Sequence, residues 1–354
     1  MSRNWLTALT SRVLMLIMAG LMYLSYACTI VNPAKAWFLE IFGLLFLPLA
    51  TVNAFLLVWA IIRRSKAFVI PFIALLPALF CVGRFVQFEG EQPETTENSI
   101  KMVSYNVGRF VPDKKHGIDS RKACMDSVFK FLNKEDADII CLQEFYLGSG
   151  QEVKSFLKKK FKNYHIEYYA YIGKHGSCGN VTLSRYPVKS KGKVKFDNST
   201  NLALYTDHII EGKKLRIYNC HFESYNISIP GIVTALGHDR NIIKETGEKM
   251  RGSILRRPKQ VDKVLRDIEN CPTESIVCGD FNDNPMSYTY RRLSRGRYDA
   301  FRQAGNGFGA TYSVLWPFLR IDYVLVPKTL DVQTYQTPKS HYSDHYPVIT
   351  EFAI

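Results

Sequence analysis

Residues 276–285 read IVCGDFNDNP and join a short apolar run to a polar turn. The apolar run predicts a buried strand at residues 275–278. Asp280 and Asn282 follow at its end, where a strand fixes the direction of a side chain. Taken by itself, the stretch is more typical of an ordinary turn, because Asx residues and proline favour turns. Its meaning depends on what the rest of the chain places beside it.

Five other apolar runs carry a polar residue at one end. These residues are Asn106 in VSYN, Glu144 in IICLQE, His221 in IYNCH, Asp322 in RIDYVLV, and Asp344 with His345 in YSDHYPVI. Each one has an ordinary explanation, as a loop carboxylate or a core histidine. Six such clusters, all at strand ends, instead favour one shared site.

The sequence from residue 100 onward alternates strand-like and helix-like segments. Strands are predicted at 100–107, 137–142, 180–183, 201–210, 214–220, 275–278, 321–327 and 347–354, and helices at 119–132, 151–162 and 258–268. Residues 224–258 are predicted to form a long polar connection. About ten strands in one 255-residue unit indicate sheets packed in layers with helices outside.

The polar residues at the strand ends indicate a particular chemistry. Glu144 with Asn106 nearby offers the oxygen ligands that suit Mg²⁺ or Mn²⁺. The sequence contains no Cys₂His₂ or HExxH spacing, which disfavours zinc. Histidines and aspartates can transfer protons while a metal neutralises phosphate oxygens. The chain also has no GxxxxGK[ST] loop and no GxSxG elbow, which disfavours nucleotide-driven phosphoryl transfer and a serine lipase.

The ordered motifs SYNV, LQEF, LSRYPV, NCHFES, GDFNDNP, RIDYVLV and SDHYPV resemble those of the endonuclease/exonuclease/phosphatase superfamily, with its deoxyribonuclease I-like fold. The resemblance covers essentially residues 100–354, and GDFN, RIDY and SDH are its most specific parts. It implies a four-layered α/β sandwich. It also implies divalent-metal-dependent cleavage of phosphate esters.

The resemblance further implies a metal-binding group. Glu144 would bind the metal, and Mg²⁺ is expected there, with Mn²⁺ as the alternative. Asn106 would support the hydration of the metal or contact the phosphate. Asp344 would complete the acidic cluster around the metal.

The remaining motif residues would carry out the reaction. Asp280 and Asn282 would orient the attacking water and the scissile phosphate. His345 would act on the water or the phosphate while Asp322 holds its imidazole, and His221 would donate a hydrogen bond to a phosphate oxygen. Asp280 and His345 stay joint candidates for the general base.

The first 99 residues differ from the rest of the chain. Apolar runs at 13–31, 37–62 and 67–86 predict three transmembrane helices, since a bilayer core of ~30 Å needs ~20 apolar residues as helix. Two helices plus a re-entrant piece is the alternative. The predicted domains are therefore a membrane anchor at 1–86, an acidic linker at 87–99 and a catalytic domain at 100–354.

Basic residues beside the apolar runs indicate an orientation. Arg3 and Arg12 precede the first run, and Arg63, Arg64 and Lys66 fill the loop between the second and the third. The positive-inside rule places these groups in the cytoplasm. Three spans then place the catalytic domain outside the cytoplasm. We expect a multi-pass protein of the cell membrane, in a bacterial inner membrane.

The charge of the predicted catalytic domain limits the substrates. It holds 39 of the 46 Lys and Arg and 27 of the 32 Asp and Glu, a formal charge of +12. Such a charge favours an anionic partner, either nucleic acid or an acidic membrane surface. A nuclease acting on DNA or RNA is the first hypothesis, and a phosphodiesterase or phosphatase of phospholipid headgroups is the second. A non-catalytic binding module is disfavoured, because every motif position is filled.

Overall fold

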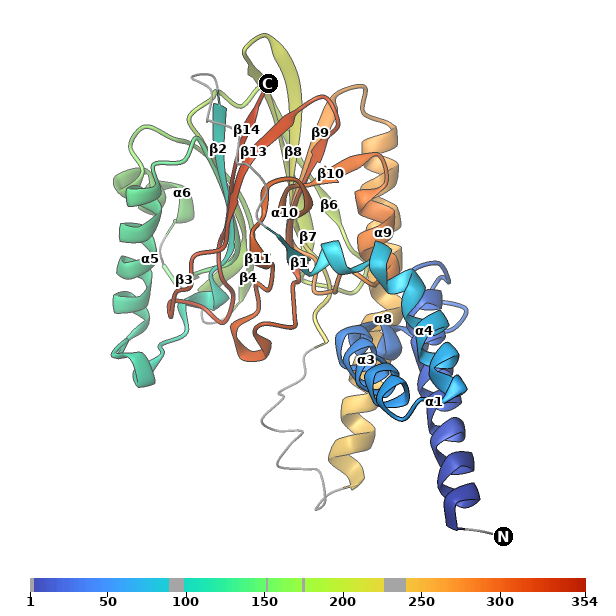
Figure 1. Ribbon diagram of the computed structural model, residues 1–354. Helices are drawn as coiled ribbons and strands as arrows, with labels where there is room; N and C mark the ends of the chain where they lie inside the picture. Colours follow the sequence, from blue (N-terminus) through green and yellow to red (C-terminus); the bar gives the residue numbers. More distant parts are fainter. Residues whose placement is uncertain (1–2, 89–98, 151, 174–175, 226–239) are drawn as a thin grey trace. The chain divides into compact units, whose positions relative to one another are not determined.

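The computed structural model describes residues 3–88, 99–150, 152–173, 176–225 and 240–354 (Figure 1). The chain forms two compact units, which we call the helical unit and the sandwich unit. The helical unit comprises Met1–Phe85, Tyr225–Pro258 and Asn284–Arg292. The sandwich unit comprises Val86–Ser224, Lys259–Asp283 and Leu293–Ile354.

The sandwich unit is built on two six-stranded sheets. The strands of the first are β6 (Ser190–Lys195), β7 (Leu202–Ile210), β8 (Lys213–His221), β9 (Glu274–Asp280), β10 (Arg297–Asp299) and β12 (Asp322–Pro327), in the order β10-β12-β9-β8-β7-β6. Those of the second are β2 (Ser99–Asn106), β3 (Ile139–Gly148), β4 (His165–Gly173), β5 (Gly176–Ser184), β13 (Asp331–Gln336) and β14 (Val348–Ala353), in the order β13-β14-β2-β3-β5-β4. A short pair, β1 (Val86–Gln87) with β11 (Gly307–Phe308), lies apart from both.

Alternation along β2 shows why it carries apolar residues on both of its faces. Ile100 and Met102 lie in the core between the two sheets, together with residues of β8, β9 and β12. Val103 and Tyr105 point the other way, into the core under α5 (Arg121–Glu135) and α6 (Val153–Lys160). Because successive side chains point to opposite faces, a strand buried on both faces needs apolar residues at both odd and even positions.

A helix also covers the outer face of the first sheet. In the part of α8 (Arg240–Glu269) that belongs to the sandwich unit, Val261 and Val264 are fully buried. The carboxylate of Asp267 in the same segment accepts a hydrogen bond from the Tyr218 hydroxyl of β8, at 2.5 Å. Helices therefore flank the paired sheets on both sides, and the predicted α/β sandwich is confirmed.

Helix α8 begins well before the residue that the sequence predicts. We expected a helix from Pro258 after a polar connection, but α8 starts at Arg240 and Pro258 lies inside it. An interior proline removes a backbone hydrogen bond at a cost of ~3 kcal/mol. Burial of Ile254 before Pro258 and of Val261 after it helps to offset that cost. Residues 226–239 of the predicted connection lie outside the described residues.

The N-terminal helices correct the prediction of three spans. They are α1 (Arg3–Cys28), α2 (Leu39–Leu44), α3 (Phe46–Ile62) and α4 (Val69–Leu75), the last followed by the 3₁₀ segment η2 (Leu76–Phe80). Among the described residues, one helix, over Thr7–Cys28, is long and apolar enough to cross a membrane. The expected second span is divided at Leu45, and its longer part, α3, reaches only about 25 Å. In the expected third span, Pro77 stands where the α-helix gives way to η2.

Part of the GDFNDNP stretch belongs to the helical unit. The Asn284 side-chain amide donates to the carbonyl oxygen of Gly43 at 2.8 Å, and the Arg84 guanidinium donates to the carbonyl oxygen of Pro285 at 3.1 Å. Gly43 has no room for a side chain, because a Cβ would lie 2.5 Å from Sγ of Cys28. Residues that we expected in the catalytic domain thus pack with the N-terminal helices. Of the predicted linker at 87–99, residues 89–98 lie outside the described residues.

Candidate active site

Strand register places three predicted site residues side by side. In the parallel pair β8–β9, His221 lies opposite Asp280. In the antiparallel pair β12–β9, Asp322 lies opposite the same Asp280. The ends of β8 and β9 and the start of β12 therefore meet at one edge of the first sheet.

The second sheet contributes two further residues to this edge. Asn106 ends β2, and its side-chain amide donates to Oδ2 of Asp280 at 2.9 Å. Glu144 lies where the register of β3 against β5 shifts, with a positive φ of 51°. Its Oε1 is 3.6 Å from Nε2 of His221. An irregularity of this kind re-aims a side chain, which here brings the carboxylate to His221.

The GDFN turn holds the Asp280 carboxylate in place. Its Oδ1 accepts from the backbone N–H of Asn282 at 2.8 Å, and its Oδ2 accepts from the Asn282 side-chain amide at 2.9 Å. Asn282 has a φ of 52°, a conformation that Asn tolerates better than most residues. The same amide donates to the carbonyl oxygen of Phe222 at 3.0 Å, which ties the turn to the end of β8.

His345 lies between two buried carboxylates. Its Nδ1 is 2.9 Å from Oδ2 of Asp322, and its Nε2 is 3.9 Å from Oδ2 of Asp280. The backbone N–H of Asp322 donates to the Thr311 hydroxyl at 3.1 Å. All three members of this buried cluster, Asp280, Asp322 and His345, are at most 5% exposed. The pairing fixes the imidazole so that Nδ1 donates to Asp322 and Nε2 faces Asp280.

Burial and charge shift the acidities of these groups. Burial, together with the Asp322 carboxylate, raises the pKa of Asp280 to about 6 against the pull of His345. Burial lowers the pKa of His345, but the Asp322 and Asp280 carboxylates outweigh it and hold that pKa well above its usual value. Burial also raises the pKa of Glu144, but the His221 imidazole and the Arg109 guanidinium reverse this and leave it lowered. Such opposed shifts among close groups are typical of catalytic sites.

The eighth predicted residue, Asp344, is close enough to His345 for its carboxylate to raise the pKa of that imidazole. Its side chain lines a cleft of about 770 Å³, which Glu144 also lines. Ser343 donates from its hydroxyl to the carbonyl oxygen of Asn106 at 2.8 Å, so this segment is held at the end of β2. The other seven, Asn106, Glu144, His221, Asp280, Asn282, Asp322 and His345, are linked to one another by contacts of 3.9 Å or less.

Residues 103–345 match the model of the Endonuclease/Exonuclease/phosphatase family. The chain belongs to this family. The predicted enzyme class, a hydrolase acting on phosphate ester bonds, is thereby confirmed, and the enzymes of the family use divalent metals. Residues 8–85 match a second model, which is described as a domain of unknown function.

Two curated relatives and a solved structure resemble the chain. An exodeoxyribonuclease of Bacillus subtilis is 26% identical over 70% of this chain and 98% of its own length. A DNA-(apurinic or apyrimidinic site) endonuclease of Dictyostelium discoideum is 23% identical over 73% and 72%. The crystal structure of an endonuclease/exonuclease/phosphatase from Beutenbergia cavernae superposes with a TM-score of 0.55 at 18% identity, over 73% of this chain and 72% of that one. This last similarity bears on the fold.

In this family member, Arg109 is a site residue that the motifs did not reveal. Its Nε donates to Oε2 of Glu144 at 3.0 Å, and both residues line the cleft. Arg109 follows Gly108 in a tight turn after β2 in which both have positive φ. The sequence signal was the glycine directly after the SYNV strand, which indicates a sharp turn at the site.

The described residues fit a divalent cation. His221 Nε2 and Asp322 Oδ1 are buried and have no hydrogen-bond partner within the part of the chain that the structure describes. Asp280, Asp322 and His345 also have possible ligand atoms within 4.8 Å of one another, although His345 could bind an ion only after losing a proton. This group differs from the predicted one of Glu144, Asn106 and Asp344. Carboxylate and amide oxygens dominate around the edge, which is the donor set that Mg²⁺ and Mn²⁺ prefer.

Proposed function

We propose that this protein is a membrane-anchored nuclease that hydrolyses phosphodiester bonds of DNA or RNA with Mg²⁺, which Mn²⁺ can replace. The observation that carries the proposal is the buried Asp280–Asp322–His345 cluster with Glu144 and His221 beside it. Glu144, Asn106 and Asp344 would hold the metal at the cleft. When bound, the metal would neutralise charge on phosphate oxygens.

The acidities favour Asp280 as the general base. A pKa of about 6 leaves its carboxylate ionised at neutral pH and still basic enough to take a proton. His345 keeps its proton, because its pKa is well above the usual value. Asp280 would accept a proton from water as the water oxygen attacks phosphorus, while the bond to the leaving oxygen breaks. His345 and His221 would stabilise the negative charge on the phosphate oxygens.

The basic charge of the domain supports an anionic polymer as the substrate. Residues 100–354 carry a formal charge of +12, and Arg109 and Lys115 line the cleft beside the carboxylates of Asp113, Glu144 and Asp344. Phosphate contacts of Lys and Arg supply most of the sequence-independent affinity for nucleic acid. Two relatives named as an exodeoxyribonuclease and a DNA endonuclease point the same way.

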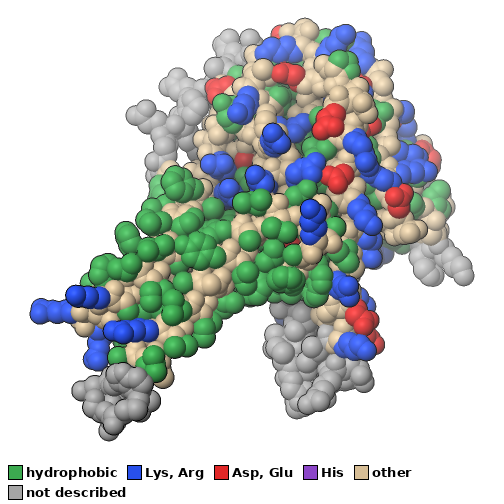
Figure 2. All heavy atoms as spheres, turned by 90° about the vertical axis from the view of Figure 1, so that its right-hand side faces the viewer, with side chains coloured by type: hydrophobic (Ala, Val, Ile, Leu, Met, Phe, Trp, Pro, Cys, Tyr) green, Lys and Arg blue, Asp and Glu red, His purple; other side chains and the backbone are tan. Residues whose placement is uncertain are grey.

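The surface of the helical unit supports membrane attachment. Figure 2 shows hydrophobic side chains over much of this surface, with Lys and Arg gathered at one end. Exposed residues include Leu16 and Ile17 of α1, Phe55 of α3, and Leu79 and Phe80 of η2. Apolar surface of this extent is costly in water and is typical of a membrane contact. The exposed basic residues Arg12, Arg63, Arg64 and Lys66 lie beside it in the sequence.

We therefore keep a membrane anchor, with α1 as its single span, as part of the proposal. Helix α1 would span the bilayer, and the shorter α3 and α4 would insert beside it. The basic end would face the cytoplasm of a bacterial cell, and residues 100–354 would lie outside it.

Purified full-length protein in detergent tests the reaction. Mg²⁺-dependent hydrolysis of plasmid DNA, RNA, sphingomyelin and phosphoinositides is measured side by side. We expect nucleic acid to be cleaved, with the activity lost in Glu144→Gln and kept in His165→Ala, a control at an exposed histidine of β4. Turnover of lipid without cleavage of nucleic acid would replace the nuclease by a phospholipid phosphodiesterase or phosphatase.

A further inference from the structure

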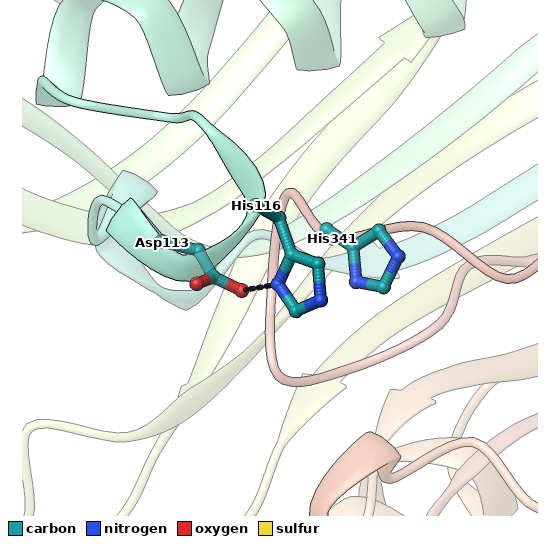
Figure 3. A group of neighbouring side chains, drawn as sticks. All are labelled: Asp113, His116 and His341. Atoms are coloured by element: carbon teal, nitrogen blue, oxygen red, sulfur yellow. Dashed lines mark hydrogen bonds and ion pairs between the residues drawn. The ribbon is translucent and has the colours of Figure 1, made fainter.

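A second group of histidines and a carboxylate lies in the cleft outside the catalytic cluster. Asp113 caps the turn η5 (Lys114–His116), which ends in His116, and His341 precedes β14 in the sequence (Figure 3). Nδ1 of His116 is 2.6 Å from Oδ2 of Asp113. The two imidazole rings stack, with centroids 3.7 Å apart and planes inclined by 9°. The three residues line the same cleft as Glu144 and Asp344.

We propose that Asp113, His116 and His341 bind a transition-metal cation of the Zn²⁺ type. Each residue offers one ligand atom, and these atoms lie within 4.8 Å of one another. Ligands around a tetrahedral zinc at ~2.0–2.1 Å lie roughly 3.3–3.4 Å apart, so side-chain adjustments of about 1 Å complete the set. The inference goes beyond the proposed function, because it concerns residues with no part in the reaction described above.

The donor set selects the kind of metal. Imidazole nitrogen suits zinc, cobalt, nickel and copper, whereas magnesium prefers oxygen ligands. Lys114 and Lys115 stand between Asp113 and His116 in the turn, and both are exposed. The positive charge of these two lysines would weaken the binding of a cation that is attracted by electrostatics alone. Coordination by two neutral imidazoles depends less on that charge, which again favours a transition metal over Mg²⁺.

The stacked rings have to move for both to bind one ion. A metal lies in the plane of each imidazole that binds it, and two parallel planes 3.7 Å apart cannot share it. Both histidines are exposed, and the outer torsion of a histidine side chain is broad, so one ring can turn at little cost. The metal would take the place of the hydrogen between Asp113 and His116. Two of the three ligands are exposed, which leaves room for water or a phosphate oxygen as a further ligand.

This site cannot be recognised from a sequence motif, because its three residues are not close together in the sequence. Asp113 and His116 are three residues apart, but the third member is more than two hundred residues away in the sequence. The absence of HExxH or Cys₂His₂ spacing therefore does not bear on it. The fold brings the third ligand in through the segment that ends in Asp344 and His345.

Cobalt binding to the full-length protein in detergent tests the proposal. Co²⁺ binds at zinc sites, and its visible absorption spectrum changes when nitrogen ligands coordinate it. We expect the number of Co²⁺ bound per chain, counted by equilibrium dialysis, to fall by one in His116→Ala and in His341→Ala. The nitrogen-dependent absorption should fall in both variants. His165→Ala is the matched control and should keep the full number.

Two results would overturn the site. One is an unchanged number of bound Co²⁺ in both histidine variants, and the other is an equal loss in His165→Ala. Circular dichroism of each variant separates loss of the site from loss of the fold. The same loss is expected in a Glu144→Gln background, where hydrolysis is abolished, so failure of the nuclease proposal leaves this test intact.

Discussion

Two clusters with the same residue types lie in different surroundings in the sandwich unit. Asp322 and His345 lie 2.9 Å apart in the buried catalytic cluster, and Asp113 and His116 lie 2.6 Å apart at the surface of the cleft. The His345 side chain is 7% exposed, whereas that of His116 is 46% exposed. The bond lengths are similar, so burial makes the difference between the two pairs.

Burial determines what each pair can do. Burial by itself lowers the pKa of His345, but the nearby Asp322 and Asp280 carboxylates outweigh it and raise that pKa well above the usual value. At the surface, the hydrogen bond from His116 lowers the pKa of Asp113, but water and salt screen the pair. The buried pair is held in one protonation state and orientation. The exposed pair is free to exchange partners, as metal binding requires.

The largest expected effect is the loss of the buried histidine. His345→Ala should lower hydrolysis by at least ~10³-fold, because it removes the cation between Asp280 and Asp322. Rates with saturating Mg²⁺ measure it, and His165→Ala serves as the control. A reduction in rate of less than tenfold would show that the buried His345 has no catalytic role.

Removing a buried ion pair should lower the free energy of unfolding more than removing an exposed one. Arg320 binds both oxygens of Asp299 at 2.9 and 2.7 Å, and both residues are almost fully buried. Asp299→Ala should cost about 3–5 kcal/mol of unfolding free energy, because it removes the carboxylate that binds a buried guanidinium at two atoms. Asp197 pairs with Lys263, and the Asp197 side chain is 83% exposed. Asp197→Ala should therefore cost less than about 1 kcal/mol of unfolding free energy. Denaturant unfolding compares them, and equal costs would contradict the argument.

Removing the charge that orients His345 gives a smaller catalytic effect. Asp322→Asn keeps the size of the side chain but removes a carboxylate that raises the pKa of His345. We expect hydrolysis to fall by ~10²-fold and the alkaline limit of the pH–rate profile to move to lower pH. A lower rate with an unchanged pH profile would mean that Asp322 acts through packing alone.

The stability of the protein should depend on the ionisation of Asp280. Its pKa in the folded protein is about 6, above the usual 3.8, so the stability this group provides is present below about pH 4 and is lost as the pH rises to about 6. Asp280→Asn cannot ionise and escapes that loss. In EDTA, its unfolding free energy relative to wild type should rise by up to about 3 kcal/mol over this interval. A flat or falling difference between pH 4 and 6 would rule out the raised pKa.

The contrast between buried and exposed positions also explains which strands could be predicted from the sequence. The eight predicted strands are β2, β3, β5, β7, β8, β9, β12 and β14, all of which lie inside the two sheets. The four strands of these two sheets that the sequence did not reveal, β4, β6, β10 and β13, are the edge strands. In β6, SKGKVK, exposed lysines replace the apolar pattern. Edge strands carry such charges to prevent pairing with other chains, which also removes the signal.

The candidate site shows a similar division. Asn106, His221, Asp280 and Asp322 were predictable because each stands at the end of an apolar strand, and the register then brings them together. Arg109, His116 and His341 come from turns and exposed segments, where no periodicity fixes a direction. The extra spans predicted near the N-terminus failed for another reason. Hydropathy does not report the breaks at Leu45 and near Pro77 that shorten the helices.

The role of Asp280 as the proton acceptor in the buried cluster is the central claim. The most direct test is Mg²⁺-dependent cleavage of plasmid DNA at neutral pH by the full-length protein and by Asp280→Asn, with folding checked by circular dichroism. We predict cleavage by the wild type and a loss of at least ~10³-fold in the folded variant. Undiminished cleavage by Asp280→Asn, or none by the wild type with either Mg²⁺ or Mn²⁺, would contradict the account.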